Sequence, residues 1–150
     1  MKHVSYKTGV EFAENPPSLS ANSVDGIVYL RFRRDVEAVE RDVDGEPSTV
    51  YRATEYVATC EDTPGALERA RANEAEWFDT VHEFAADALS RDARSRRDAL
   101  LAASDPRTLE DFPQSEEARA AWLTYRQALR DIPGQAGFPF EVTWPEAPDE

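Results

Sequence analysis

The sequence predicts an α+β fold: a small N-terminal antiparallel β module, a long central helix or helix pair, and a C-terminal helix with an extended aromatic arm. Three observations predict it. Residues 26–60 are rich in β-branched and aromatic residues. Residues 66–104 contain neither glycine nor proline, and residues 114–148 change from a helical period to a period of two. The expected parts are therefore 1–60, 61–104 and 105–150.

The first part is expected to be a small sheet. Alternating apolar residues allow a short strand between Val4 and Phe12, whereas residues 15–25, rich in Pro, Ser and Asn, are predicted to be loop or disorder. Three strands are predicted to follow, and Asp44-Gly45 is a hairpin-type turn that joins the last two. These strands are expected at 26–33, 36–42 and 49–58.

The middle part has a helical period. Thr63 and Pro64 suit a cap and a first helical residue. One helix over 64–103 is one interpretation, and a break within Ser90–Asp98, leaving helices of about 64–89 and 93–103, is the other. The apolar stripe is wide for a lone helix, so we expect self-association or an obligate partner to cover it. The stripe residues expected to do this are Trp77, Phe78, Val81 and Phe84.

The last part pairs a helix with an arm. Ser115 or Gln114 can cap the helix, and Pro133-Gly134 ends it. Its apolar face contains Trp122, Tyr125, Leu129 and Ile132. The arm alternates Phe138, Phe140, Val142 and Trp144 with smaller or polar residues, typical of an edge strand or a polyproline-like path. The arm is apolar and long enough to reach back along the helix, so we expect it to dock onto Trp122 and Tyr125.

The amino-acid composition limits the kinds of partner and function that this chain can have. The 150 residues include 30 acidic and 17 basic residues, for a net charge of −13, which disfavours nucleic acid and anionic membranes as partners. No apolar run is long enough to span a membrane, and the N-terminus has no signal-peptide core. The single cysteine, Cys60, excludes an intramolecular disulfide.

No residue pattern indicates catalysis. His82 and Glu83 are adjacent on a predicted helix and point in different directions, so they do not form a metal site. Cys60 has no histidine partner nearby in the sequence, and its ordinary role is a small buried apolar residue. We therefore expect no enzyme activity, no metal and no cofactor.

The C-terminal sequence, about residues 94–148, contains a distinctive set of residues. They are Arg97, Asp98, Leu100, Leu101, Ser104, Asp105, Trp122, Tyr125, Arg126, Gln127, Leu129, Arg130, Asp131, Ile132, Pro133, Gln135, Gly137, Phe138, Pro139, Val142, Trp144 and Pro145. In these residues the segment resembles the phage tail assembly chaperone family. One residue departs from the pattern: Pro106 stands where the family would suggest tryptophan. Residues 26–57 more weakly resemble a small β module of phage tail proteins.

The resemblance implies a bacteriophage or prophage factor that assists tail or tail-fibre assembly by non-covalent protein binding, in the host cytoplasm or in the virion tail. Its partner would be a phage tail or tail-fibre protein. The residues expected to define the module or contact this partner are Trp122, Tyr125, Arg126, Arg130, Phe138, Pro139, Phe140 and Trp144. Two alternatives stay open: a permanent minor tail component, and an acidic inhibitor that mimics DNA.

Overall fold

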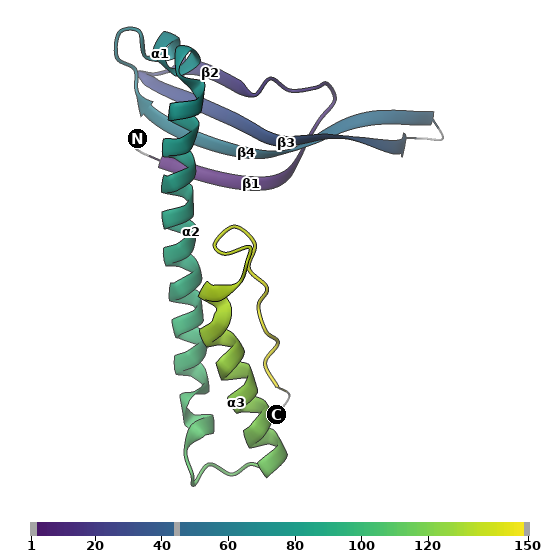
Figure 1. Ribbon diagram of the computed structural model, residues 1–150, viewed down its shortest axis with the longest axis vertical. Coiled ribbons are helices and arrows are strands. Elements are labelled where there is room, and N and C mark those ends of the chain that lie inside the picture. Colours follow the sequence, from purple (N-terminus) through teal and green to yellow (C-terminus); the bar gives the residue numbers. More distant parts are fainter. Residues whose placement is uncertain (1–2, 44–45, 149–150) are drawn as a thin grey trace. The chain divides into compact units, whose positions relative to one another are not determined.

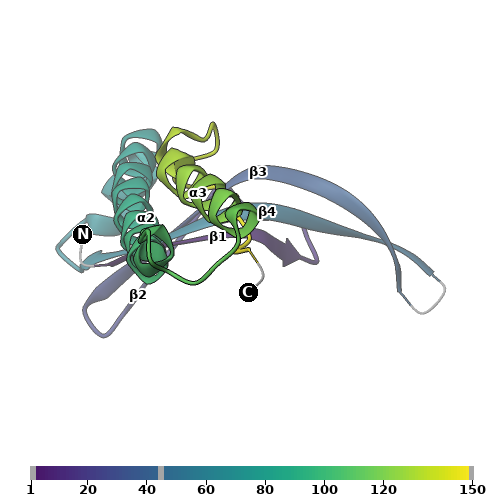
Figure 2. The same cartoon turned by 90° about the horizontal axis from the view of Figure 1, so that it is seen from below.

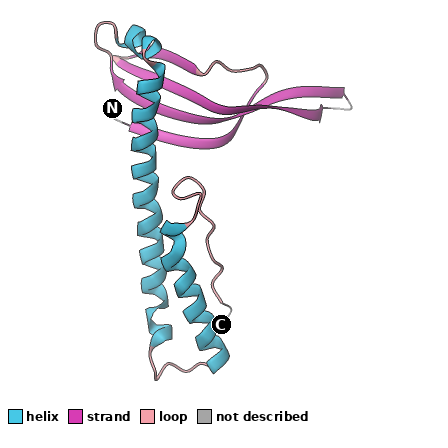
Figure 3. Cartoon of the chain, viewed as in Figure 1, coloured by secondary structure: helices cyan, strands magenta, loops and turns pink. Residues whose placement is uncertain are grey.

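The computed structural model describes residues 3–43 and 46–148, which divide into two compact units (Figure 1). The first unit comprises Met1–Ala85 and the second Ala86–Glu150. Strands occur in the first unit, and the second is helical with an irregular C-terminal arm (Figure 3). The predicted α+β class is confirmed.

The first unit contains a four-stranded antiparallel sheet of order β1-β4-β3-β2. Its strands are β1 (His3–Phe12), β2 (Leu19–Val24), β3 (Ile27–Val43) and β4 (Glu46–Glu61). Strand β2 corrects the prediction of a loop over residues 15–25. It pairs with β3 through its backbone, and a two-residue turn joins them in which Asp25 (φ 51°) and Gly26 (φ 74°) both have positive φ. A strand at the sheet edge needs little apolar patterning, so its Ser and Asn residues concealed it.

Strand β3 is a single strand where two, at 26–33 and 36–42, were predicted. Its pairing with β4 shifts register between Arg34 and Glu37, and Asp35 there has φ 54°. Such a bulge bends a strand and does not end it. The predicted turn at Asp44-Gly45 lies outside the described residues; the flanking Val43 and Glu46 pair in register.

The central helical region breaks at Asn73 and is continuous through Ser90–Asp98. Helix α1 (Ala66–Ala72) ends at Asn73, whose side-chain amide donates to the carbonyl of Arg69 at 3.2 Å. Helix α2 (Glu74–Ser104) then runs for 31 residues. The interpretation without a break within Ser90–Asp98 is confirmed, whereas the break at Asn73 was not predicted. The Ser90–Asp98 stretch stays helical because it is made largely of good helix formers and bonds along its own surface, as Arg91 does with Asp87.

The core of the first unit lies where α1 and the start of α2 cover one face of the sheet. Phe78 of α2 packs on Phe32 of β3 and edge-on against Tyr56 of β4, with ring centroids 5.8 and 5.2 Å apart. Val81 is fully buried. The central sheet residues on this face are Val28, Leu30, Phe32, Tyr56 and Ala58. Much of the stripe that was expected to need an outside partner is therefore covered by the chain's own sheet.

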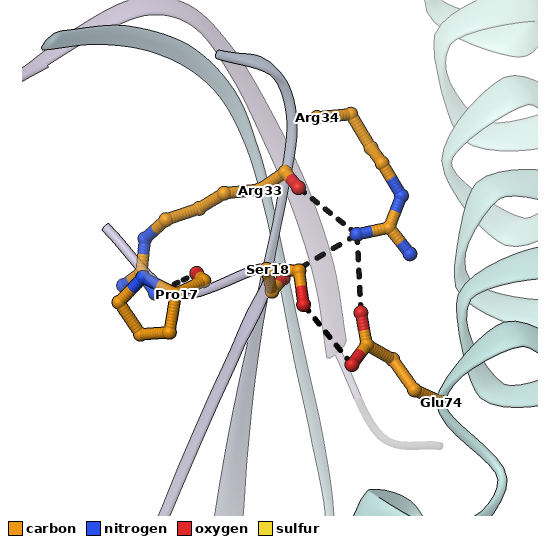
Figure 4. Close-up of polar contacts among 5 residues, drawn as sticks. All are labelled: Pro17, Ser18, Arg33, Arg34 and Glu74. Atoms are coloured by element: carbon orange, nitrogen blue, oxygen red, sulfur yellow. Dashed lines mark hydrogen bonds and ion pairs between the residues drawn. The ribbon is translucent and has the colours of Figure 1, made fainter. Parts of the chain in front are cut away.

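A polar cluster fixes the beginning of α2 to the sheet (Figure 4). The guanidinium of Arg34 donates to the carboxylate of Glu74 at 3.3 Å and lies 4.0 Å from the centre of the Phe78 ring. The Ser18 hydroxyl donates to the same carboxylate at 3.1 Å. Since Glu74 is the first residue of α2, these bonds also place a negative charge at the positive end of the helix dipole.

The second unit packs α3 (Glu116–Asp131) against the end of α2. Ser115 caps α3 by accepting a hydrogen bond from the Ala118 amide at 3.1 Å. The connection from α2 begins with the 3-10 turn η1 (Asp105–Thr108), where Pro106 occupies a first-turn position that needs no N–H donor. A second 3-10 turn, η2 (Ile132–Gly134), leads into the arm.

The arm is not an edge strand. Residues 136–140 form turns and residues 142–148 have no regular structure. The peptide bond between Phe138 and Pro139 is cis. A two-residue alternation survives only locally, where Val142 and Trp144 are partly buried and Thr143 between them is exposed.

Tyr56 makes the stability of the first unit sensitive to alkaline pH. Burial, chiefly, raises the pKa of its phenol from 10.0 to about 12. The folded state therefore keeps its proton where the unfolded state releases it, so stability is complete below pH 10 and falls as pH rises toward about 12. We expect the unfolding free energy, measured with urea at a series of pH values, to fall through this window. Tyr56→Phe should lose that decline; an unchanged slope would contradict the assignment.

Candidate functional site

A cluster of apolar side chains joins α2, α3 and the arm in the second unit; we call it the C-terminal cluster. Tyr125, Leu129 and Ile132 are buried at its centre. Around them pack Leu100 and Leu101 of α2, Trp122 of α3, and Phe138, Val142 and Trp144 of the arm. The prediction that the arm docks onto the face of α3 is thereby confirmed. The ring of Trp122 meets that of Tyr125 edge-on at 5.6 Å.

Arg126 ties α3 to the end of α2. The residue is 7% exposed, and its guanidinium donates to the Leu101 carbonyl (2.6 Å), the Ser104 hydroxyl (2.6 Å) and the Asp105 carboxylate (2.7 Å). The Leu101 carbonyl lies in the last turn of α2 and also accepts a hydrogen bond from the Ser104 hydroxyl at 2.9 Å. Arg126 thus places a positive charge at the negative end of the α2 dipole. Its charge-assisted hydrogen bonds offset the free-energy cost of burying that charge.

Gln135 fastens the arm after it turns. Its Nε2 donates to the Thr143 carbonyl at 2.8 Å, and its Oε1 accepts from the Thr143 amide at 2.9 Å. Within the loop so closed, the Glu141 amide donates to the Gly137 carbonyl at 2.7 Å. A Cβ at Gly137 would lie 2.8 Å from the Glu141 backbone oxygen, so glycine is required by this close approach.

The docked arm and α2 enclose a shallow groove of about 320 Å³. Its lining residues are Leu89, Asp92, Ala93 and Arg96 of α2, and Pro139, Phe140, Val142 and Trp144 of the arm. The Arg96 guanidinium lies 4.2 Å from the centre of the Trp144 ring, which fixes that wall by a cation–π contact. The groove therefore offers apolar surface flanked by one acidic and one basic group.

The structure distributes the sequence-predicted contact residues over the C-terminal cluster and the groove. Trp122, Tyr125, Arg126 and Phe138 serve the interior of the unit. Pro139, Phe140 and Trp144 line the groove. Arg130 is exposed on α3.

The α2 wall of the groove was missed. Arg96 belongs to a run of arginines on α2 that also contains Arg91, Arg94 and Arg97. Arg91 and Arg97 do pair with neighbouring aspartates, but Arg94 and Arg96 lie over the rings of Phe138 and Trp144. Aromatic residues in the arm were the available signal, since arginine stacks on such rings.

The first unit contains a second hollow, of about 430 Å³, beside Cys60. It is lined by Cys60, Arg69, Asn73, Glu76, Trp77, Thr80 and Phe84. Of the stripe residues, Trp77 and Phe84 line this hollow and Phe84 is 54% exposed, whereas Val81 is buried and Phe78 packs on the sheet. Burial raises the pKa of the Cys60 thiol, which makes it a weaker nucleophile at neutral pH.

Within residues 3–43 and 46–148, no group of three or more His, Cys, Asp and Glu side chains is placed to hold a metal ion. Among the helices described, none has the length and apolarity needed to cross a membrane.

Comparison with protein families matches residues 90–149 to the model described as phage tail assembly chaperone protein. The resemblance inferred from the sequence is therefore confirmed for this segment, which includes the end of α2, α3, the arm and most of the groove lining. Searches of curated proteins and of solved structures found no match.

Removing Trp144 tests the docking of the arm. Trp144→Ala should lower the unfolding free energy by about 2 to 3 kcal/mol, somewhat less than for a fully buried tryptophan, because Trp144 is only partly buried. Denaturant midpoints measure this, and Leu123→Ala, at a 53% exposed position on α3, serves as the control with little change. Equal midpoints for wild type and Trp144→Ala would show that the arm adds no stability.

The Gln135 contact can be tested with a one-atom change. Gln135→Glu replaces the donor Nε2 with an oxygen that faces the Thr143 carbonyl, so we expect a loss of about 1 kcal/mol and faster hydrogen exchange at the Thr143 amide. The Ala118 amide, bonded to Ser115, should exchange at its wild-type rate. Unchanged exchange at Thr143 would refute the contact.

Proposed function

We propose that this chain acts in bacteriophage or prophage tail assembly, as a non-catalytic chaperone that binds a tail protein. The match of residues 90–149 to the phage tail assembly chaperone family carries the proposal. The binding is non-covalent, and it takes place in the cytoplasm of the host bacterium while the tail is built.

We place the contact at the groove of the second unit. Supporting this, Pro139, Phe140 and Trp144 expose part of their apolar surface there while the arm beneath them is fixed by the C-terminal cluster and Gln135. A surface that is ordered before binding loses little entropy when a partner docks. The groove thus suits an apolar side chain or short apolar segment of a tail protein.

A tail-fibre protein is the partner we favour among tail components. Fibre subunits expose apolar surface before they assemble, and a chaperone that occupies such surface prevents premature association. Phe84 and Trp77 in the first unit offer a second apolar contact for the same partner or for another copy of the chain.

The groove is tested by one changed residue and one control. Each tail protein of the same phage is co-expressed with the full chain, and complexes are measured by size-exclusion chromatography with light scattering. Phe140→Asp should weaken the complex with its tail partner at least about tenfold, because it places a charge in an apolar contact. Leu123→Asp, also an exposed apolar position, should bind as wild type does.

The outcomes separate the alternatives. Equal weakening by both variants, or by neither, would remove the groove from the contact. A phage that lacks the gene and still builds normal tails would refute the assembly role. Stoichiometric amounts of the chain in purified virions, detected by mass spectrometry, would identify a permanent tail component, and inhibition of a nuclease would support DNA mimicry.

A further inference from the structure

The ends of β3 and β4 extend beyond the other strands as a two-stranded hairpin (Figures 1 and 2). Strand β2 pairs with β3 from Ile27 to Phe32, and β1 pairs with β4 only as far as Tyr51. Residues 35–42 of β3 therefore have β4 on one side and, among the residues that the structure describes, no strand on the other.

The free edge of β3 begins at a defined point. The Arg33 amide donates to the Ser18 carbonyl at 2.8 Å, and the Arg34 side chain reaches the same carbonyl at 3.4 Å (Figure 4). The bulge at Asp35 follows directly, and regular pairing with β4 resumes at Glu37. Beyond the bulge, β3 has a regular ladder on one side only.

The two edges of the hairpin differ in their capacity to pair. The β4 edge contains Pro47, which has no N–H to donate, and prolines block edges in this way. Residues 35–42 contain no proline, so their N–H and C=O groups alternate along the edge as they do in any strand. The β3 edge is thus the one that can accept a further strand.

The negative charge of residues 35–42 favours a partner segment of positive charge. Residues 35–42 contain four acidic residues, Asp35, Glu37, Glu40 and Asp42, and all four are exposed. The one basic residue in this stretch, Arg41, lies 2.5 Å from the Glu11 carboxylate, and Arg52 of β4 lies 3.7 Å from the Glu37 carboxylate. A basic segment is therefore attracted to this edge, and an acidic one is repelled.

We propose that residues 35–42 of β3 bind an extended segment of a partner protein as an added strand, in which lysine or arginine alternates with apolar residues. Backbone hydrogen bonds hold the segment, its basic side chains lie on the face of Glu40 and Asp42, and its apolar side chains lie on the opposite face, beside Val39. A third strand also stabilises a hairpin that has only two here. The edge lies outside residues 90–149, so the proposal does not depend on the role in tail assembly.

The test uses the full chain and a capped ten-residue peptide of alternating lysine and valine. Residue-resolved hydrogen exchange by NMR should show slowed exchange for outward amides of residues 35–42, with binding that weakens as salt rises. The same peptide with proline at alternate valines cannot form a ladder and should bind at least about tenfold more weakly. Protection at β1 or β2 instead, equal binding of the proline peptide, or no binding at millimolar peptide overturns the proposal.

A pair of charge-matched variants tests the selection by charge. Glu40→Lys/Asp42→Lys should weaken peptide binding at least about tenfold. Glu68→Lys/Glu83→Lys changes the net charge equally at exposed positions on α1 and α2, and should leave binding within about twofold of wild type. Equal effects of the two double variants would reduce the interaction to net charge and contradict a site on β3.

Discussion

Helix α2 has apolar side chains that are buried in both units, and the rest of the structure depends on how this is done. A helix draws most of its stability from the partner that covers its apolar face. In the first unit that partner is the sheet, where Phe78 packs on Phe32, and Val81 is fully buried. In the second unit it is α3 with the arm, which cover Leu100 and Leu101. Each unit therefore has a core of its own, and α2 contributes to both.

Arginine side chains hold both ends of this helix, but they interact with the helix dipole in different ways. At its start, Arg34 holds the Glu74 carboxylate, so the helix begins with a negative charge that its dipole favours. At its end, the Arg126 guanidinium meets the Leu101 carbonyl directly, where the dipole favours a positive charge. A buried arginine is costly unless all its donors find acceptors, which explains why Ser104 and Asp105 accompany Arg126.

Sequence patterns predicted the elements that bury apolar residues and missed those held by polar contacts. The apolar face of α3 was predicted from the helical period of its apolar residues. The docking of Trp144 was predicted from the length of the arm, which is enough to reach back along α3. The break at Asn73 did not, because one asparagine is a weak stop signal. Strand β2 was missed because its pairing is backbone to backbone. Arg126 and Arg130 are alike in sequence, yet only Arg126 faces the end of α2, a distinction that requires the fold.

The contact between Gln135 and Thr143 has a consequence for how the arm can recognise anything. A primary amide has the same donor and acceptor as a peptide group, so Gln135 stands in for a neighbouring strand at one residue. Both backbone groups of Thr143 are thereby occupied, and no foreign strand can pair with the arm at that point. The contact proposed for the arm therefore uses ring surfaces, which adapt to many sequences, whereas the site proposed on the edge of β3 uses chiefly the peptide backbone and charge.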